Sequence, residues 1–326
     1  MNGCHKLGHL LVTLPLVACL LFPATASAQQ YPTKPVRIVV PFGPGGVADT
    51  TVRVVAQKLA ERMGQPFIVD NKPGAGGFVA ATTVTQAKPD GYTLFLISNG
   101  TAVSVSLFKS MPFDALKDFA PVSTLAFFTL AIVTHADAKP GSLKELLAAG
   151  KSGSQFNVGT INVGSTQHLA AELFKSSTGL DFTIVPYKTS PDVVGALRAK
   201  DVQLAFEILP PLLPQIQAGW MRPLAVTSDR RFSGWPNVPT VMESGVQGYD
   251  VSSWNGIAAP AGTPNAIIER LSKEINAVVA MPDVRQKLLD LGVEAQGSSP
   301  DALKQLLVTE IGKWKAVVER AKIEKQ

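Results

Sequence analysis

The 326-residue sequence predicts an α/β protein of two lobes with a ligand cleft between them. Its length is about twice the roughly 150 residues of an ordinary domain. Strand-like and helix-like segments alternate along the chain, which is typical of a mostly parallel sheet covered by helices on both faces. Two segments, residues 121–135 and 249–260, are placed where the chain would cross between lobes.

The composition excludes several classes of protein. Apolar residues make up 46% of the chain, so a disordered protein is excluded. The net charge of +5 is spread along the sequence without a Lys/Arg block. Nucleic-acid binding is therefore not predicted, whereas a mild attraction for small anions is.

The first 28 residues form a predicted secretory signal peptide. Lys6 precedes an apolar run, residues 10–22, and Ala26-Ser27-Ala28 is a small-x-small cleavage site. The run is shorter than the roughly 20 residues of a membrane-spanning helix. Residues 16–19 also resemble a lipoprotein processing site, which would tether the protein through Cys19. We expect cleavage after residue 28 and a periplasmic product.

Cleavage would leave 326 − 28 = 298 residues and remove both cysteines, Cys4 and Cys19. A disulfide framework or a thiol nucleophile is then excluded. His135 and His168 would be the remaining histidines, and they lie far apart in the sequence. This spacing gives no zinc signature, so neither a metal nor a cofactor is predicted.

The first lobe begins with a strand at residues 36–40, a Pro/Gly loop and a helix from about Val47. Apolar residues recur at helical spacing as far as Met63, and Gly64 follows as a C-terminal cap. A strand at 67–69, the motif NKPGAGG, a helix to about Ala87 and a strand at 92–97 come next.

The rest of the chain continues this alternation. Further strands are predicted at residues 156–160, 182–185, 202–206 and 224–227. Helix starts are predicted at Ser142, which forms a capping box with Glu145, after the 164–166 loop, and at Ser190-Pro191, Thr263-Pro264 and Ser299-Pro300. If both long segments cross, residues 29–129 and 251–326 form lobe 1, and residues 130–250 form lobe 2.

The first candidate site is the Gly-rich turn of VPFGPGGVAD. Free backbone amides at a helix N-terminus bind anions, and Gly45 and Gly46 let a ligand approach the main chain. Asp49 could accept from a ligand donor or simply favour the start of the helix. A tight strand-to-helix turn without a ligand is the alternative interpretation.

The second candidate is GTINVGSTQH, where Gly164, Ser165 and Thr166 join a strand to a helix. Two such turns across a cleft would suit a ligand with a carboxylate at each end. A Ser-His-Asp hydrolase built on Ser165, His168 and Asp49 is disfavoured, because the sequence has no Gly-x-Ser-x-Gly elbow there.

Other polar residues follow predicted strand ends and could line the cleft. Ser98 ends one strand, and Tyr187 and Lys188 follow another. Glu207 follows a third. Trp254 is interpreted as a core or hinge residue, with a ligand platform as the alternative.

An ordered set of motifs now resembles the receptor family of tripartite tricarboxylate transporters, also called TctC or Bug proteins. The motifs are YPTKPVRIVVPFGPGGVAD, NKPGAGG, KPDGYTL, HLAAELFK, VPYK, LAVTSDRR, VPTVMESG, APAGTP and EIGKWKAVV. They run through the whole chain after the leader.

The resemblance implies a type II periplasmic-binding-protein (Venus-flytrap) architecture that closes on a small carboxylate: a di- or tricarboxylate, an amino acid or an aromatic acid. It implies delivery of that ligand to a membrane permease or a sensor, by a protein expected to be a monomer. The implied ligand-binding residues are Phe42, Gly45, Gly46 and Asp49 from one lobe and Thr160, Gly164, Ser165 and His168 from the other.

The sequence departs from the family at two places. Ile161 and Asn162 stand where small residues are more usual, and Glu207 stands where an Asp or a small residue is expected. Glu207 could therefore accept from an ammonium or hydroxyl group of the ligand. The alternative function is a secreted α/β enzyme acting on a carboxylated substrate, which would depend on Asp49, His168 or Glu207.

Overall fold

The structure, a computed structural model, describes residues 1, 3 and 31–326. The predicted leader and Cys19 fall on residues outside this described part, so the signal-peptide and lipoprotein interpretations stay predictions. No helix among the described residues is both long enough and apolar enough to cross a membrane.

The strands form one sheet in the order β2-β1-β3-β9-β4-β7-β5-β6, with β8 and β10 both paired to β4. The strands are β1 Val36–Val40, β2 Phe67–Asn71, β3 Thr93–Ser98, β4 Phe119–His135, β5 Asn157–Ile161, β6 Thr183–Tyr187, β7 Leu204–Ile208, β8 Met221–Val226, β9 Ser252–Pro260 and β10 Glu294–Ala295.

Parallel pairing is confined to two sets of strands, one of β1, β2 and β3 and the other of β5, β6 and β7. The long strands β4 and β9 run antiparallel to their neighbours. The predicted parallel sheet is therefore present in each set, but antiparallel strands join the two sets.

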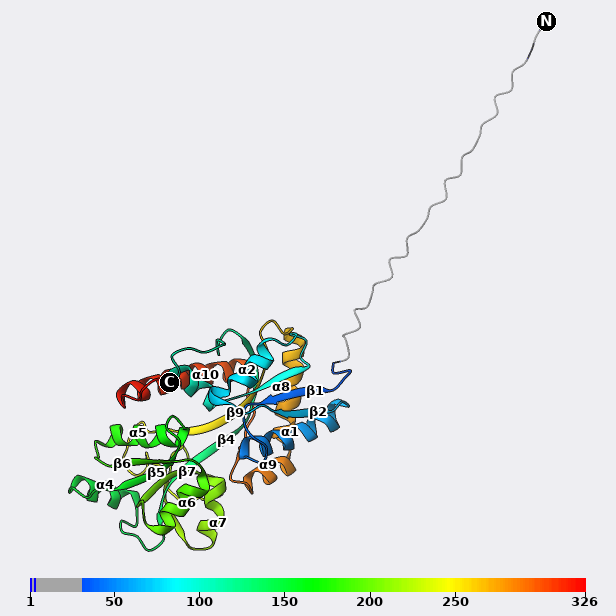
Figure 1. Cartoon of the computed structure of the whole chain (residues 1–326). Helices are drawn as coiled ribbons and strands as arrows, with labels where there is room; N and C mark the ends of the chain where they lie inside the picture. Colours follow the sequence, from blue (N-terminus) through cyan, green and yellow to red (C-terminus); the bar gives the residue numbers. More distant parts are fainter. Residues whose placement is uncertain (2, 4–30) are drawn as a thin grey trace. The chain divides into compact units, whose positions relative to one another are not determined.

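Strand β4 carries the chain from one set to the other. Its residues 119–129 pair with β9, and its residues 130–134 pair with β7. β9 pairs in turn with β3, so both long segments lie between the two sets as predicted. In Figure 1, helices α1, α8 and α9 lie beside β1 and β2, and α4 to α7 surround β5, β6 and β7.

Most predicted helices are present. They are α1 Val47–Met63, α2 Phe78–Thr85, α4 Leu143–Lys151, α5 Thr166–Thr178, α6 Ser190–Ala199, α8 Asn265–Val279 and α10 Pro300–Arg320. Gly64 adopts a left-handed conformation with φ 72° and ends α1, as predicted. Ser142, Ser165 and Ser299 each cap their helix with a side-chain hydroxyl.

Two predicted caps are wrong. Helix α6 is capped by Thr189 rather than Ser190, because Thr189 and Asp192 form a reciprocal capping box one residue earlier. Helix α8 has Pro264 as its N-cap, since the Thr263 hydroxyl donates instead to the Pro260 carbonyl.

Three short helices were not predicted. They are α3 Asn99–Leu107 and α7 Leu209–Gln217, of nine residues each, and α9 Pro282–Leu289, of eight. Asn99-Gly100 has the composition of a turn, and α7 contains three prolines. Two of these prolines lie in the first turn, where a missing amide costs nothing. Helix α3 packs into the apolar core that contains Trp254, Trp314 and Tyr249, all 1% exposed or less, and α7 packs into a second apolar cluster.

Candidate functional site

The first predicted turn, residues 41–46, joins β1 to α1. Gly45 has a φ of 84°, and a Cβ built on it would meet nothing within 4 Å. Gly46 is the N-cap of α1, and no side chain caps this helix. The first amides of α1 and the positive end of its dipole therefore suit an anion. Phe42 is 37% exposed in the same turn.

Asp49 lies behind this turn with both carboxylate oxygens occupied. Oδ2 accepts from the Gly45 amide and from Arg53 Nε, each at 2.9 Å, and Oδ1 accepts from Asn71 Nδ2 at 2.8 Å. Asn71 Nδ2 also donates to the Phe42 carbonyl at 3.0 Å. This network fixes the shape of the turn, and sequence reasoning had not singled out Arg53 or Asn71.

The electrostatics of Asp49 agree with that role. Burial alone would raise the pKa of Asp49, but hydrogen bonds from Arg53, the Gly45 amide and Asn71 hold its pKa below the ordinary value. Because the side chain is only 3% exposed and ionised, it stabilises the turn as a buried acceptor.

The second predicted turn, residues 162–165, joins β5 to α5. Gly164 has a φ of 83°, and a Cβ built on it would lie 2.4 Å from Leu107 Cδ2 of α3. The positive φ favours glycine here, and a larger residue would also require the Leu107 side chain to move. The Ser165 hydroxyl accepts from the His168 amide at 3.0 Å and donates to the Ile161 carbonyl at 2.9 Å. Ser165 thus shapes the start of α5.

Asn162, one of the departures from the family, holds this turn against β6. Its main-chain N–H donates to the Tyr187 carbonyl at 2.9 Å, and its side-chain Nδ2 donates to the Lys188 carbonyl at 3.3 Å. Tyr187 and Lys188 therefore support the turn through their main chain.

Three of the predicted site residues carry buried polar atoms without a hydrogen-bond partner in the described part of the chain. They are Oγ1 of Thr160, Nδ1 of His168 and Oε2 of Glu207. The other carboxylate oxygen of Glu207 accepts from Gln167 Nε2 at 2.6 Å and from the Ile208 amide at 2.8 Å. Glu207 thus links the start of α5 to the start of α7.

Burial shifts the titration of two of these residues in opposite directions. It lowers the pKa of His168, which favours a neutral imidazole at neutral pH. It raises the pKa of Glu207, against the Gln167 and Ile208 hydrogen bonds that favour the ionised form. A neutral imidazole has both a donor and an acceptor nitrogen to offer.

Helix α3 lies near both predicted turns. Asn99 Nδ2 donates to Thr166 Oγ1 at 2.8 Å, and Trp314 Nε1 of α10 donates to Asn99 Oδ1 at 2.8 Å. At the other turn, a Cβ built on Gly100 would lie 3.9 Å from Phe42 Cζ. The first turn of α3 is therefore hydrogen-bonded to the start of α5 and lies close to Phe42 of the other turn. Ser98, also among the predicted residues, is its buried N-cap.

The arrangement of Ser165, His168 and Asp49 does not support the alternative function, an enzyme built on these residues. The Ser165 hydroxyl bonds to main-chain groups, and the oxygens of Asp49 bond to Gly45, Arg53 and Asn71. No Ser-His-Asp relay therefore joins Ser165, His168 and Asp49 in this structure. Within residues 31–326 no group of three or more His, Cys, Asp or Glu side chains is arranged to hold a metal.

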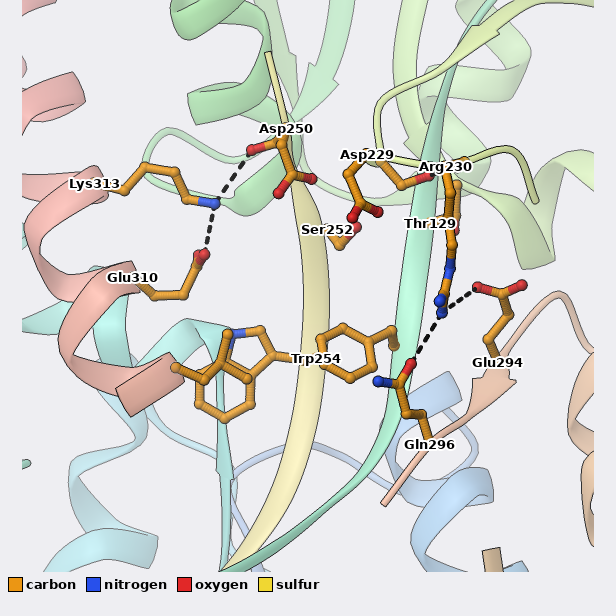
Figure 2. A pocket seen from close by; sticks show the side chains of 13 residues that line it. Thr129, Asp229, Arg230, Asp250, Ser252, Trp254, Glu294, Gln296, Glu310 and Lys313 are labelled. Carbon is orange, nitrogen blue, oxygen red and sulfur yellow. Dashed lines mark hydrogen bonds and ion pairs between the residues drawn. The ribbon is translucent and has the colours of Figure 1, made fainter. Parts of the chain in front are cut away.

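A cavity of about 240 Å³ lies elsewhere, beside β4 and β9, and contains none of the predicted residues. Figure 2 shows its walls, with Glu310 and Lys313 on one side and Glu294 and Gln296 on the other. Trp254 lies in its floor. Sequence reasoning had marked Trp254 but not this cavity.

The fold and the paired turns define a class: a solute-binding protein with two α/β lobes. The chain belongs to the receptor family of the tripartite tricarboxylate transporters (TctC), whose match covers residues 51–323. Among its relatives, BugT of Bordetella pertussis is 36% identical over 298 residues, which are 90% of this chain and 91% of BugT.

Two solved structures agree closely. An R. palustris protein determined with adipate has a TM-score of 0.78 and 34% identity, and the match covers 91% of this chain and 100% of that one. MatC from Rhodopseudomonas palustris, determined with bound malate, has a TM-score of 0.73 and 32% identity, with 88% of this chain and 100% of MatC covered.

Proposed function

We propose that this protein is a periplasmic receptor that binds a small carboxylate between the two Gly-rich turns and delivers it to a tripartite tricarboxylate-type permease. The observation that carries the proposal is the position of α3, whose Asn99 hydrogen-bonds Thr166 and whose Gly100 lies close to Phe42. The adipate and malate of two related structures support a carboxylate as the ligand.

The proposed site has a main-chain part and a side-chain part. The amides of the uncapped α1 would bind one carboxylate, with Phe42, Gly45 and Gly46 at its edge. Thr160, His168 and Glu207 carry unpartnered polar atoms at the other end, which would meet the rest of the ligand. Gly164 and Ser165 shape that end, while Asp49 and Ser98 hold the first turn and the start of α3 in position.

We also propose the lobe boundaries at residues 129/130 and 250/251. The change of partner along β4, from β9 to β7, supports the first of them. We further propose that the protein is exported by a signal peptide cleaved after residue 28, and that it binds its ligand without catalysing a reaction. Membership of a receptor family supports both.

Thermal unfolding of the purified protein against a panel of carboxylates tests the function. The panel contains adipate, malate, succinate, citrate, glutamate and benzoate, with 1,6-hexanediol as the uncharged counterpart of adipate. A ligand at 100 times its dissociation constant adds about 2.7 kcal/mol, which raises the midpoint by a few degrees. A shift with one or more acids and none with the diol is expected.

Two results would contradict the proposal. If no acid shifts the midpoint, in protein shown by mass spectrometry to carry no co-purified ligand, the carboxylate is wrong. If an acid is consumed or changed during incubation, the protein is an enzyme and not only a receptor.

A further inference from the structure

The cavity of Figure 2 is built at the junction of three parts of the chain. Its floor is the face of β4 and β9 that carries Thr129, Ser252 and Trp254. Helix α10 forms one wall, and β10 with residues 228–230 forms the opposite wall. None of its lining residues belongs to the proposed carboxylate site.

The basic groups of this cavity are already engaged. Arg230 Nη2 donates to Gln296 Oε1 at 2.9 Å and lies 3.7 Å from Glu294 Oε2. Lys313 Nζ pairs with Glu310 Oε1 and donates to the Asp250 carbonyl at 3.2 Å. Both cations are therefore already paired with side chains or main-chain groups of the cavity walls.

Its acidic groups are less well matched. Among the described residues, neither Asp229 nor Asp250 forms an ion pair within 4.0 Å. Glu310 is 6% exposed, and its Oε2 has no hydrogen-bond partner in the described chain. Lys313 thus pairs with Glu310 alone, while the exposed side chains of Asp229 and Asp250 have no cation within ion-pair distance among the described residues.

The pKa values of Glu310 and Asp250 reflect the negative charge near them. Burial raises the pKa of Glu310, Lys313 lowers it and Asp250 raises it further. Burial also raises the pKa of Asp250, Lys313 lowers it and Asp229 raises it. Asp250 is therefore repelled by Asp229 and in turn repels Glu310, so a further positive charge near Asp250 would be stabilised.

The floor of the cavity is aromatic and apolar. Phe127, Trp254 and Leu306 line it beneath the carboxylates. The Trp254 side chain is 1% exposed and its indole nitrogen has no partner within the described residues. Aromatic faces attract organic cations, and an apolar floor suits a short hydrocarbon body. A bare metal ion fits poorly, because these carboxylates are not grouped as metal ligands within residues 31–326.

We propose that this cavity is a second ligand site, which takes a small primary ammonium compound. Asp229, Asp250 and Glu310 receive the ammonium group, and the hydrocarbon part lies against Phe127 and Leu306, the partly exposed apolar residues of the lining. The site differs in charge from the two turns, which suit an anion. It goes beyond the carboxylate receptor function and does not depend on it.

Isothermal calorimetry with n-butylammonium chloride at low ionic strength tests the proposal. Low salt matters because exposed carboxylates are screened at higher ionic strength. We expect saturable binding of one equivalent, and none with sodium butyrate, which has the same hydrocarbon chain and the opposite charge. Quenching of tryptophan fluorescence over the same concentrations gives a second readout.

The double variant Asp229→Asn/Asp250→Asn should weaken n-butylammonium binding at least tenfold. The matched control is Asp181→Asn/Asp201→Asn, which removes the same charge from two exposed acids outside the cavity. The control should bind n-butylammonium as the unmodified protein does. Far-UV circular dichroism of both variants checks the fold, and the single variant Asp250→Asn replaces the double variant if that one is unfolded.

Three results would overturn the proposal: no binding of n-butylammonium, equal weakening in the two double variants, or calcium chloride binding at the same residues more tightly than the amine. The first would leave the cavity as a solvent pocket. The second would reduce the effect to net charge, and the third would make the site one for a metal.

Discussion

Asn99 Nδ2 donates to Thr166 Oγ1 at 2.8 Å, so a residue that follows β3 is joined directly to the first residue of α5. The two residues are 67 positions apart, and their helices follow strands of different parallel sets, β3 and β5. Asn99 is fully buried and also receives the Trp314 indole N–H. This contact joins the start of α3 to the start of α5.

The variant Thr166→Val should therefore weaken ligand binding. It keeps the volume of the side chain but leaves the Asn99 amide unpaired, which costs about 1–3 kcal/mol when the group is buried. We expect a lower urea midpoint and a several-fold loss of affinity for the carboxylate found in the thermal panel. Thr183→Val, on an exposed strand position, is the control and should change neither. Unchanged affinity in Thr166→Val would show that the Asn99–Thr166 hydrogen bond does not contribute to ligand binding.

Gly45→Ala should reduce carboxylate affinity at least tenfold. Alanine disfavours the φ of 84° at Gly45, so the turn must move away from the ligand. Gly64→Ala is a matched control at the other end of α1, with a φ of 72° and no atom within 4 Å of the new Cβ. Both variants should lose about 1 kcal/mol of stability, but only Gly45→Ala should lose affinity. Equal carboxylate affinities of the Gly45→Ala and Gly64→Ala variants would show that the first turn does not bind the ligand.

Asp49→Asn should destabilise the protein at neutral pH and much less in acid. The pKa of Asp49 is lowered in the folded state, so its contribution is present above the unfolded pKa of about 3.9 and is lost as the pH falls through the folded value. We expect a loss of about 1–3 kcal/mol at pH 7, from unpaired buried donors, that shrinks toward pH 3. Urea unfolding at the two pH values measures it, and a constant difference would contradict the assignment.

Glu207→Gln should show the opposite pH trend. The pKa of Glu207 is raised by burial, so its contribution is complete below the unfolded pKa of about 4.3 and is lost as the pH rises through the folded value. Glutamine can still accept from Gln167 and Ile208, so the variant should gain stability relative to the unmodified protein between pH 4 and pH 8.

Glu243→Gln is the control for that trend. Hydrogen bonds from Arg231 and the Thr240 amide lower the pKa of Glu243, so its contribution is present at neutral pH and is lost in acid. Glu243→Gln should therefore lose stability relative to the unmodified protein as the pH rises from 4 to 8. The same trend in both variants would show that Glu207 is not held in an unfavourable ionised state.

Local sequence determined most of the elements. The strand at residues 36–40, the helix from Val47 and its end at Gly64 follow from residue patterns within each segment. The same local logic misplaced the starts of α6 and α8 and missed α3 and α7. In α3 the composition of a turn gave way to packing against α10, which sequence neighbours do not report.

The candidate site divides in the same way. Glycines at positive φ and hydroxyl caps are local requirements, so Gly45, Gly164 and Ser165 could be predicted from their own neighbours. That Asn71 donates to Asp49, that Asn99 donates to Thr166, and that Lys313 donates to the Asp250 carbonyl could not. Those contacts join residues distant in sequence, and only the packing of helices and strands decides which buried polar groups find a partner.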